Sequence, residues 1–187
     1  ARRPGLKAVD MFRAVGDGRI KALWIMGTNP AVSMPDATRV RAALKTCDFV
    51  VVSDVTRTDT TRYADMLLPA AAWGEKSGTV TNSERRMSRQ RPFLPLPGTA
   101  RPDWDIICDV ARRMGFGEGF AFEGPAAIFR EHAALSAFEN GGARLFDLGG
   151  LAAIADADYE RFAPRHWPAK QGSPHAERLL GDGRFPT

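Results

Sequence analysis

Cysteine is scarce in this sequence of 187 residues, which contains only Cys47 and Cys108. The two lie far apart, and neither belongs to a C-x-x-C pair or to a cluster with histidine. Zinc and iron–sulfur sites need several such ligands at short spacing, so the sequence excludes both kinds of site. We expect both cysteines to pack as reduced thiols, which is typical of a cytoplasmic protein.

Long apolar runs are missing as well. No stretch approaches the roughly 20 residues that span a bilayer, and the N-terminus has no charged-then-apolar signal pattern, so we expect no membrane partner. The chain starts at Ala1 without an initiator methionine and ends at Thr187 without a tail signal. We therefore expect an internal piece of a larger protein.

Two common nucleotide-binding motifs are also absent. No G-x-G-x-x-G occurs, which excludes an ordinary dinucleotide-binding domain. A phosphate-binding loop is excluded too, because Glu75 separates Gly74 from Lys76 and Pro69 stands where the first glycine is needed.

The composition that remains is ordinary for a globular domain, with 44% hydrophobic and 26% charged residues. The net charge is +4, and the excess is concentrated in Arg85, Arg86, Arg89 and Arg91. This cluster suits a nucleic-acid surface, an anion site, a contact with other parts of the protein, or simply a solvated face. Because the stretch has few aromatic residues, we expect no nucleic-acid partner.

Helical and strand patterns alternate through residues 6–69. Helices are expected at 6–15, 33–47 and 58–64, and strands at 22–26, 49–52 and 65–69. Ser33 is the expected N-cap of the second helix. The continuous apolar strand Phe49–Val52 is typical of a parallel sheet buried on both faces. This order predicts an α/β fold with a Rossmann-like wound parallel sheet and flanking helices.

The pattern changes after residue 78. We expect an extended ribbon at 79–90, a proline-rich loop at 92–102, and helices at 103–115 and 125–138. Glycine and proline become frequent from Gly141 onward. We therefore expect one α/β domain over residues 1–140 and a loop-rich arm over residues 141–187.

Polar residues follow two of the expected strands, namely Gly27-Thr28-Asn29-Pro30 and Ser53-Asp54. Ligands of open parallel sheets bind beyond the carboxyl ends of the strands. Gly27 lets the backbone approach a ligand closely, and Pro30 holds Asn29 extended. Asp54 suits ribose hydroxyls or the N–H groups of a guanine. Either segment alone is explained as a turn or a cap, but together they favour a nucleotide site.

Lys76 and Asp103 are weaker candidates on local evidence. Lys76 suits a phosphate, although a solvated lysine explains it equally well. Asp103 opens a helix and suits an N-cap.

These segments, in this order, resemble the molybdopterin oxidoreductase family, which holds molybdenum between two molybdopterin guanine dinucleotides. The matching segments are Ala22–Pro30, Val51–Asp54, Tyr63–Pro69, Trp73–Gly78, Thr81–Arg86 and Pro102–Trp104. Within the family, Thr81–Arg86 and Glu131–Asn140 are most similar to assimilatory nitrate reductase catalytic subunits. Formate dehydrogenases share the strand-end motifs and resemble the chain less after residue 80.

The resemblance implies that residues 1–140 are part of the domain that binds one dinucleotide, and that residues 141–187 lead toward a further domain. It implies cofactor-binding roles for Gly27, Thr28, Asn29, Pro30, Ser53, Asp54, Lys76 and Asp103. Asp54 and Asp103 are assigned to guanosine and Lys76 to phosphate. No catalytic or metal-ligating residue is expected in this chain.

The resemblance also implies a parent enzyme that reduces nitrate to nitrite with molybdenum bound as the bis(molybdopterin guanine dinucleotide) cofactor. A 4Fe-4S cluster is expected in the parent but not in this chain. The expected partners are the remaining domains of the parent and an electron donor protein or reductase subunit. A formate dehydrogenase-like enzyme and a stand-alone nucleotide-binding module are the alternatives.

Overall fold

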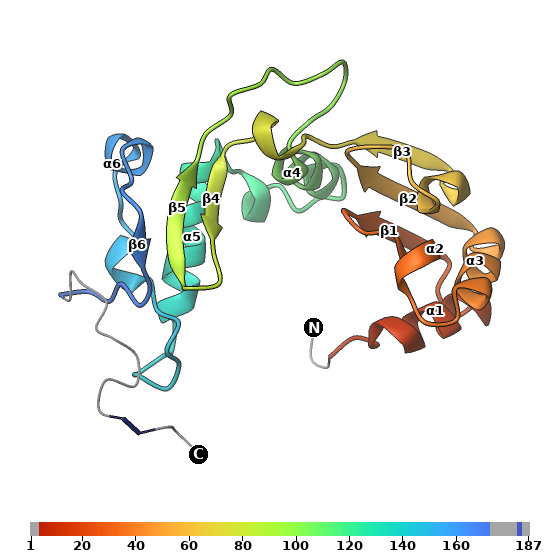
Figure 1. Ribbon diagram of the computed structural model, residues 1–187, viewed down its shortest axis with the longest axis horizontal. Helices are drawn as coiled ribbons and strands as arrows, with labels where there is room; N and C mark the ends of the chain where they lie inside the picture. The colour runs from red at the N-terminus through yellow and green to blue at the C-terminus, as the bar shows by residue number, and fades with distance from the viewer. Residues whose placement is uncertain (1–3, 173–182, 185–187) are drawn as a thin grey trace. The chain divides into compact units, whose positions relative to one another are not determined.

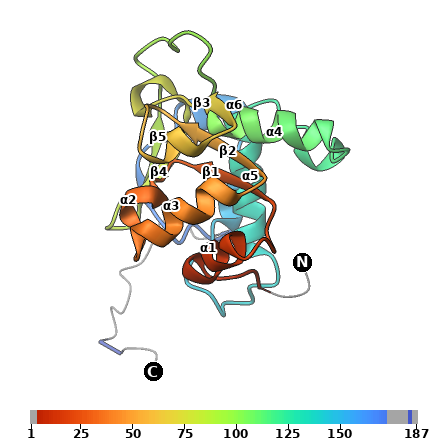
Figure 2. The same cartoon turned by 90° about the vertical axis from the view of Figure 1, so that its right-hand side faces the viewer.

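The computed structural model describes residues 4–172 and 183–184. The chain divides into two compact units, of which the first contains Ala1–Ala72 and Leu96–Val110. The second contains Trp73–Pro95 and Ala111–Thr187. The elements of both units are labelled in Figures 1 and 2.

A parallel sheet is the centre of the first unit (Figure 1). Its three strands are β1 (Ala22–Met26), β2 (Phe49–Asp54) and β3 (Met66–Pro69), in the order β1-β2-β3. Helix α1 (Ala8–Gly16) precedes β1. Helices α2 (Pro30–Ser33) and α3 (Ala37–Thr46) connect β1 to β2, and the 3-10 turn η1 (Thr60–Tyr63) connects β2 to β3. This arrangement confirms the predicted α/β fold with a parallel sheet and flanking helices.

The helices pack against the sheet through one hydrophobic core. Its buried members come from α1, α2, α3, β1 and β2: Phe12, Ile25, Ala31, Val40, Leu44, Val50 and Val52. Val40 and Leu44 lie one helical turn apart on α3, as the sequence periodicity predicts. The three valines of β2 supply the β-branched side chains that suit a buried strand.

The start of α3 differs from the prediction that Ser33 caps it. Asp36 is the N-cap, and its Oδ1 accepts a hydrogen bond of 3.3 Å from the backbone N–H of Arg39. Ser33 instead ends the short helix α2, and its hydroxyl donates to the carbonyl of Asn29 at 3.0 Å. Pro30 favours a helix start directly after Asn29. The helical turn that begins there ends before Pro35, so the chain makes two helices instead of one.

A short parallel bridge adds a later segment to the sheet of the first unit. Arg101 pairs with Ala70, directly after β3. The N–H of Ala71 donates to the carbonyl of Arg101 at 2.9 Å, and the N–H of Arg101 donates to the carbonyl of Pro69 at 3.0 Å. Helix α4 (Asp103–Arg113) begins two residues later. Its first residue therefore emerges at the carboxyl edge of the sheet.

The second unit is built on an antiparallel sheet of β4 (Gly78–Thr81), β5 (Arg86–Gln90) and β6 (Arg165–His166). It also contains η2 (Trp73–Glu75), η3 (Glu118–Phe120), α5 (Pro125–Ala137), η4 (Gly149–Leu151) and α6 (Asp156–Glu160). One core joins β5, α5 and the later segments: Met87, Phe129, Ala133, Leu148, Leu151, Tyr159, Phe162 and Ala169. Residues 148–169 therefore share a core with α5, and the boundary at residue 140 stays a prediction.

Across residues 4–172 and 183–184, no helix has both the length and the apolar composition needed to cross a membrane.

Candidate functional site

The two strand-end segments singled out in the sequence emerge side by side. Parallel pairing places Met26 opposite Ser53, and the N–H of Gly27 donates to the carbonyl of Ser53 at 3.0 Å. Gly27 has a φ of +59°, a conformation that glycine adopts without strain. The register thus confirms that residues 27–30 and 53–54 share the carboxyl edge of the sheet.

Asn29 is tied into the fold through the oxygen of its side-chain amide. Its Oδ1 accepts from the hydroxyl of Thr60 at 2.7 Å and from the backbone N–H of Thr60 at 3.2 Å. Asn29 is half-buried, Thr28 is exposed and Pro30 is buried. Only the NH₂ group of Asn29 therefore remains for a ligand.

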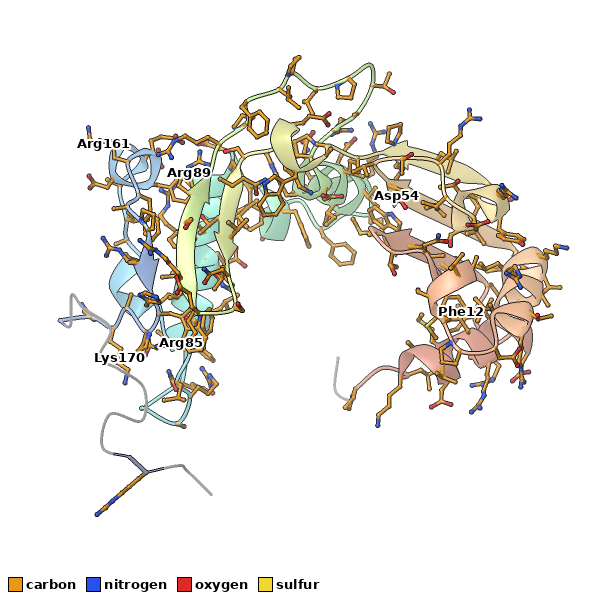
Figure 3. The ribbon with its side chains drawn as sticks, in the orientation of Figure 1. Phe12, Asp54, Arg85, Arg89, Arg161 and Lys170 are labelled. Carbon is orange, nitrogen blue, oxygen red and sulfur yellow. The ribbon has the colours of Figure 1, made fainter. Side chains whose placement is uncertain are left out.

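Ser53 and Asp54 are neighbours with different surroundings. Ser53 has no exposed surface, and its hydroxyl accepts a hydrogen bond of 2.8 Å from the indole nitrogen of Trp24. Its visible role is to join β1 to β2, and a ligand contact by Ser53 stays a prediction. Asp54 is half-exposed, and its Oδ1 accepts from the N–H of Val55 at 2.8 Å (Figure 3).

Two adjoining cavities lie beside β3, along the segment that runs from the end of β2 through η1, and we call them together the strand-end recess. The first, of about 280 Å³, is lined by Val52, Asp54, Val55, Thr56, Arg57, Thr61, Leu67, Leu68 and Pro69. The second, of about 440 Å³, is lined by Arg57, Thr58, Asp59, Thr61, Arg62 and Leu67. Three residues line both cavities, so the recess is continuous along η1.

Charged side chains of both signs line the recess. Asp54 lines only the first cavity, Arg57 lines both, and Arg62 lines only the second. Both arginines are exposed, and neither forms an ion pair or a side-chain hydrogen bond with any residue that the structure describes. Asp59 adds one carboxylate to the second cavity. Each cavity of the recess therefore offers one carboxylate and at least one guanidinium group.

This set of side chains fits a nucleoside phosphate. A carboxylate accepts from guanine N–H groups or ribose hydroxyls, and guanidinium groups match the geometry of phosphate oxygens. The sequence analysis did not identify Arg57, Thr60 or Arg62. The available signal was a run rich in threonine and arginine, residues 56–62, directly after the second strand end.

Asp103 is the first residue of α4 and lies in the first unit. The start of this helix is fixed by Arg101, whose guanidinium contacts Asp105 at 2.8 Å and Asp109 at 3.1 Å. The hydrogen bonds from Arg101 to Asp105 and Asp109 raise the pKa of its guanidinium, which stays charged. Lys76 follows η2 in the second unit, so its contact with the same ligand stays a prediction.

Arg85 and Arg89 of the basic cluster belong to the second unit and are labelled in Figure 3. The guanidinium of Arg85 contacts the carbonyl of Trp167 and lies 5.2 Å from the centre of its ring. Arg89 is buried, contacts Glu160 at 2.7 Å and lies 4.6 Å from the ring centre of Tyr159. Arg91 also contacts the Glu160 carbonyl, so three of the four arginines connect β5 and the residues on either side of it to residues 159–167.

In the part of the chain that the structure describes, no three histidine, cysteine, aspartate or glutamate side chains are grouped closely enough to hold a metal ion.

Comparison with known proteins adds to this geometry. The family described as molybdopterin oxidoreductase matches residues 1–113. The chain is 54% identical over 172 residues to a nitrate reductase from Klebsiella oxytoca, covering 91% of this chain and 20% of that protein. It is 45% identical over 132 residues to the alpha subunit of F420-dependent formate dehydrogenase 2 from Methanococcus maripaludis, covering 71% of this chain and 19% of that protein.

A solved structure shares the fold. Acetylene hydratase from Pelobacter acetylenicus matches with a TM-score of 0.63 and 19% identity, covering 84% of this chain and 20% of that one. The chain spans about a fifth of the length of each of these proteins.

Proposed function

This chain belongs to the molybdopterin oxidoreductase family, and we propose that its first unit binds the nucleotide end of one molybdopterin guanine dinucleotide in the strand-end recess. The observation that carries this proposal is the set of charged side chains that line the recess. Asp54 lines the first cavity, Arg57 lines both, and Arg62 lines the second. A guanosine diphosphate has groups for both kinds of side chain, with hydrogen-bond donors on the base and ribose and negative charge on the phosphates.

The remaining predicted residues extend this site in the proposal. Gly27, Thr28 and Pro30 frame Asn29, and Asp103 supplies a second carboxylate for guanosine at the same edge of the sheet. Lys76 is assigned to a phosphate of the same dinucleotide. We assign no catalytic residue to this chain, since each of these side chains binds or orients the nucleotide.

The parent activity that we propose is the reduction of nitrate to nitrite, as in assimilatory nitrate reductases. The 54% identity to a protein named nitrate reductase supports this activity. When bound, the molybdenum of a bis(molybdopterin guanine dinucleotide) cofactor would supply the oxygen-atom transfer. A 4Fe-4S cluster elsewhere in the parent, an electron donor protein or reductase subunit, and a cytoplasmic location complete the proposal. The isolated chain is expected to have no turnover.

A formate dehydrogenase-like parent is the second candidate. The formate dehydrogenase from Methanococcus maripaludis matches 71% of the chain, compared with 91% for the nitrate reductase from Klebsiella oxytoca, and at lower identity. Nitrate reductase is therefore the better supported parent. The segment of the parent gene that supplies the molybdenum ligand distinguishes the two enzymes.

Calorimetric titration of the 187-residue chain with guanosine diphosphate tests the binding proposal. We expect weak binding, with a Kd of about 0.1–1 mM, since we expect other parts of the parent to share the dinucleotide. Asp54→Asn is expected to weaken binding about tenfold, because a hydrogen bond to a charged group contributes about 1.5–3 kcal/mol.

Asp10→Asn is the matched control, because Asp10 is exposed and, among the residues that the structure describes, forms an ion pair only with Arg13 on α1. It should bind guanosine diphosphate like the unchanged chain. A folded Asp54→Asn chain with unchanged affinity would contradict the proposed site.

A further inference from the structure

Thr60 makes three hydrogen bonds although it has no exposed surface. Its hydroxyl donates to Oδ1 of Asn29 at 2.7 Å, and its backbone N–H donates to the same oxygen at 3.2 Å. The hydroxyl also accepts from the N–H of Ala31 at 3.2 Å. Thr60 thus joins η1 to the segment that follows β1.

These contacts determine which end of the Asn29 amide faces outward. A backbone N–H only donates, so the atom of Asn29 that meets the N–H of Thr60 is the oxygen. The NH₂ group is then the free end of a half-buried side chain, and no residue that the structure describes accepts a hydrogen bond from it. Asn29 consequently presents a donor and no acceptor.

We propose that Thr60 is a positioning residue that holds Asn29 so that its Nδ2 donates to an acceptor oxygen of the bound guanosine diphosphate. The inference rests on the proposed function. Thr60 does not touch the ligand, because it is fully buried. It acts through Asn29, while the next residue, Thr61, lines both cavities of the recess. The segment after β1 and the recess are therefore held in one arrangement.

Three substitutions separate the parts of this proposal. Thr60→Ser keeps the hydroxyl, and Thr60→Val keeps the shape but removes both hydroxyl hydrogen bonds. Asn29→Asp keeps an oxygen for Thr60 and replaces the outward donor with an acceptor. Thr46→Val is the matched control, because Thr46 is exposed at the end of α3 and its hydroxyl contacts only helix carbonyls.

The test is titration of each 187-residue variant with guanosine diphosphate, together with the ¹⁵N order parameter of the Asn29 side-chain amide. In the unchanged chain, Thr60→Ser and Thr46→Val, we expect a rigid amide and affinities within about twofold of each other. In Thr60→Val we expect a more mobile amide and at least about fivefold weaker binding. In Asn29→Asp we expect binding weaker by more than about tenfold at a nearly unchanged melting temperature.

An equally rigid Asn29 amide in Thr60→Val overturns the positioning role, and unchanged affinity in Asn29→Asp overturns the donor assignment. If Thr60→Val does not fold, the order parameter of the Asn29 amide is measured in Thr60→Ala instead. Asn29→Asp, at a half-buried position, still tests the assignment of Nδ2 as a donor. If the unchanged chain does not bind guanosine diphosphate, the proposed function and the donor assignment fail together. The order parameter still decides whether Thr60 fixes Asn29.

Discussion

The indole N–H of Trp24 donates a hydrogen bond of 2.8 Å to the hydroxyl of Ser53, and so joins the side chains of β1 and β2 next to the strand-end recess. Ser53 has no exposed surface, so its hydroxyl supports the edge of the sheet from within. The position of Asp54, the next residue, therefore depends on a neighbour that is fixed on both its backbone and its side chain.

Ser53→Ala is expected to reduce stability by about 1–3 kcal/mol, because it leaves the N–H of Trp24 without its acceptor. The free energy of unfolding is measured by urea denaturation. Ser83→Ala, at an exposed position, is the control and should change it by less than about 0.5 kcal/mol. Equal stability of the two variants would contradict this role of Ser53.

The paired substitution Arg57→Gln with Arg62→Gln is expected to abolish the preference for guanosine diphosphate over guanosine. Both guanidinium groups line the second cavity, where we place the phosphates. The nucleoside should lose much less affinity than the diphosphate, because it has no negative charge for the two guanidinium groups to contact. Titrations with both ligands at two salt concentrations measure the effect, since salt screens exposed charges.

Arg19→Gln removes an exposed arginine whose one ion-pair partner in the described part of the chain is Asp17, and it should leave both titrations unchanged. If the paired variant still prefers the diphosphate, the assignment of the two arginines to the site is wrong.

Arg89 and Glu160 form an ion pair whose two partners should have unequal effects on stability. The side chain of Arg89 is 4% exposed and that of Glu160 is 60% exposed. Arg89→Ala should lower the free energy of unfolding by about 2–4 kcal/mol, because it also removes the contact with the Tyr159 ring and the hydrogen bonds to the carbonyls of Gly78 and Gln90.

Glu160→Ala should lower the free energy of unfolding by less than about 1 kcal/mol, because an ion pair with an exposed partner contributes little. Thermal or urea unfolding of both variants makes the comparison. Equal losses would show that the ion pair itself, and not the burial of Arg89, holds β5 to α6.

Single-stranded oligonucleotides are expected to bind this chain weakly and without a steep dependence on salt. The guanidinium groups of Arg85, Arg89 and Arg91 already contact residues 159–167, and few charges of the cluster remain for phosphates. Fluorescence anisotropy between 50 and 200 mM salt, on the order of the range over which such binding collapses, measures this. A fall of several orders of magnitude in affinity would restore the nucleic-acid interpretation.

The sequence was sufficient where a pattern is local. The strand at 22–26 has the bounds of β1, and the neighbouring positions of Gly27 and Asp54 followed from the parallel topology. It was insufficient where two good local candidates compete. Ser33 and Asp36 both suit an N-cap, and the choice of Asp36 depends on the separate helix that Pro30 starts.

Contacts between residues far apart in the chain could not be predicted from the sequence either. Thr60 meets Asn29 across 31 positions, and no spacing rule for helices or strands relates them. The hydrogen bond between Trp24 and Ser53 likewise joins residues 29 positions apart, and a ligand contact by Ser53 stays a prediction. Arg57 and Arg62 became candidates only when the recess between β2, β3 and η1 was visible.

The most direct test of the central claim is a map of backbone amide chemical shifts in the 187-residue chain during titration with guanosine diphosphate. We predict that the largest changes fall on residues 27–30, 54–62 and 103, all of which belong to the first unit. Changes confined to the sheet of β4, β5 and β6, or no saturable change at millimolar ligand, would contradict a nucleotide site at the carboxyl edge of the parallel sheet.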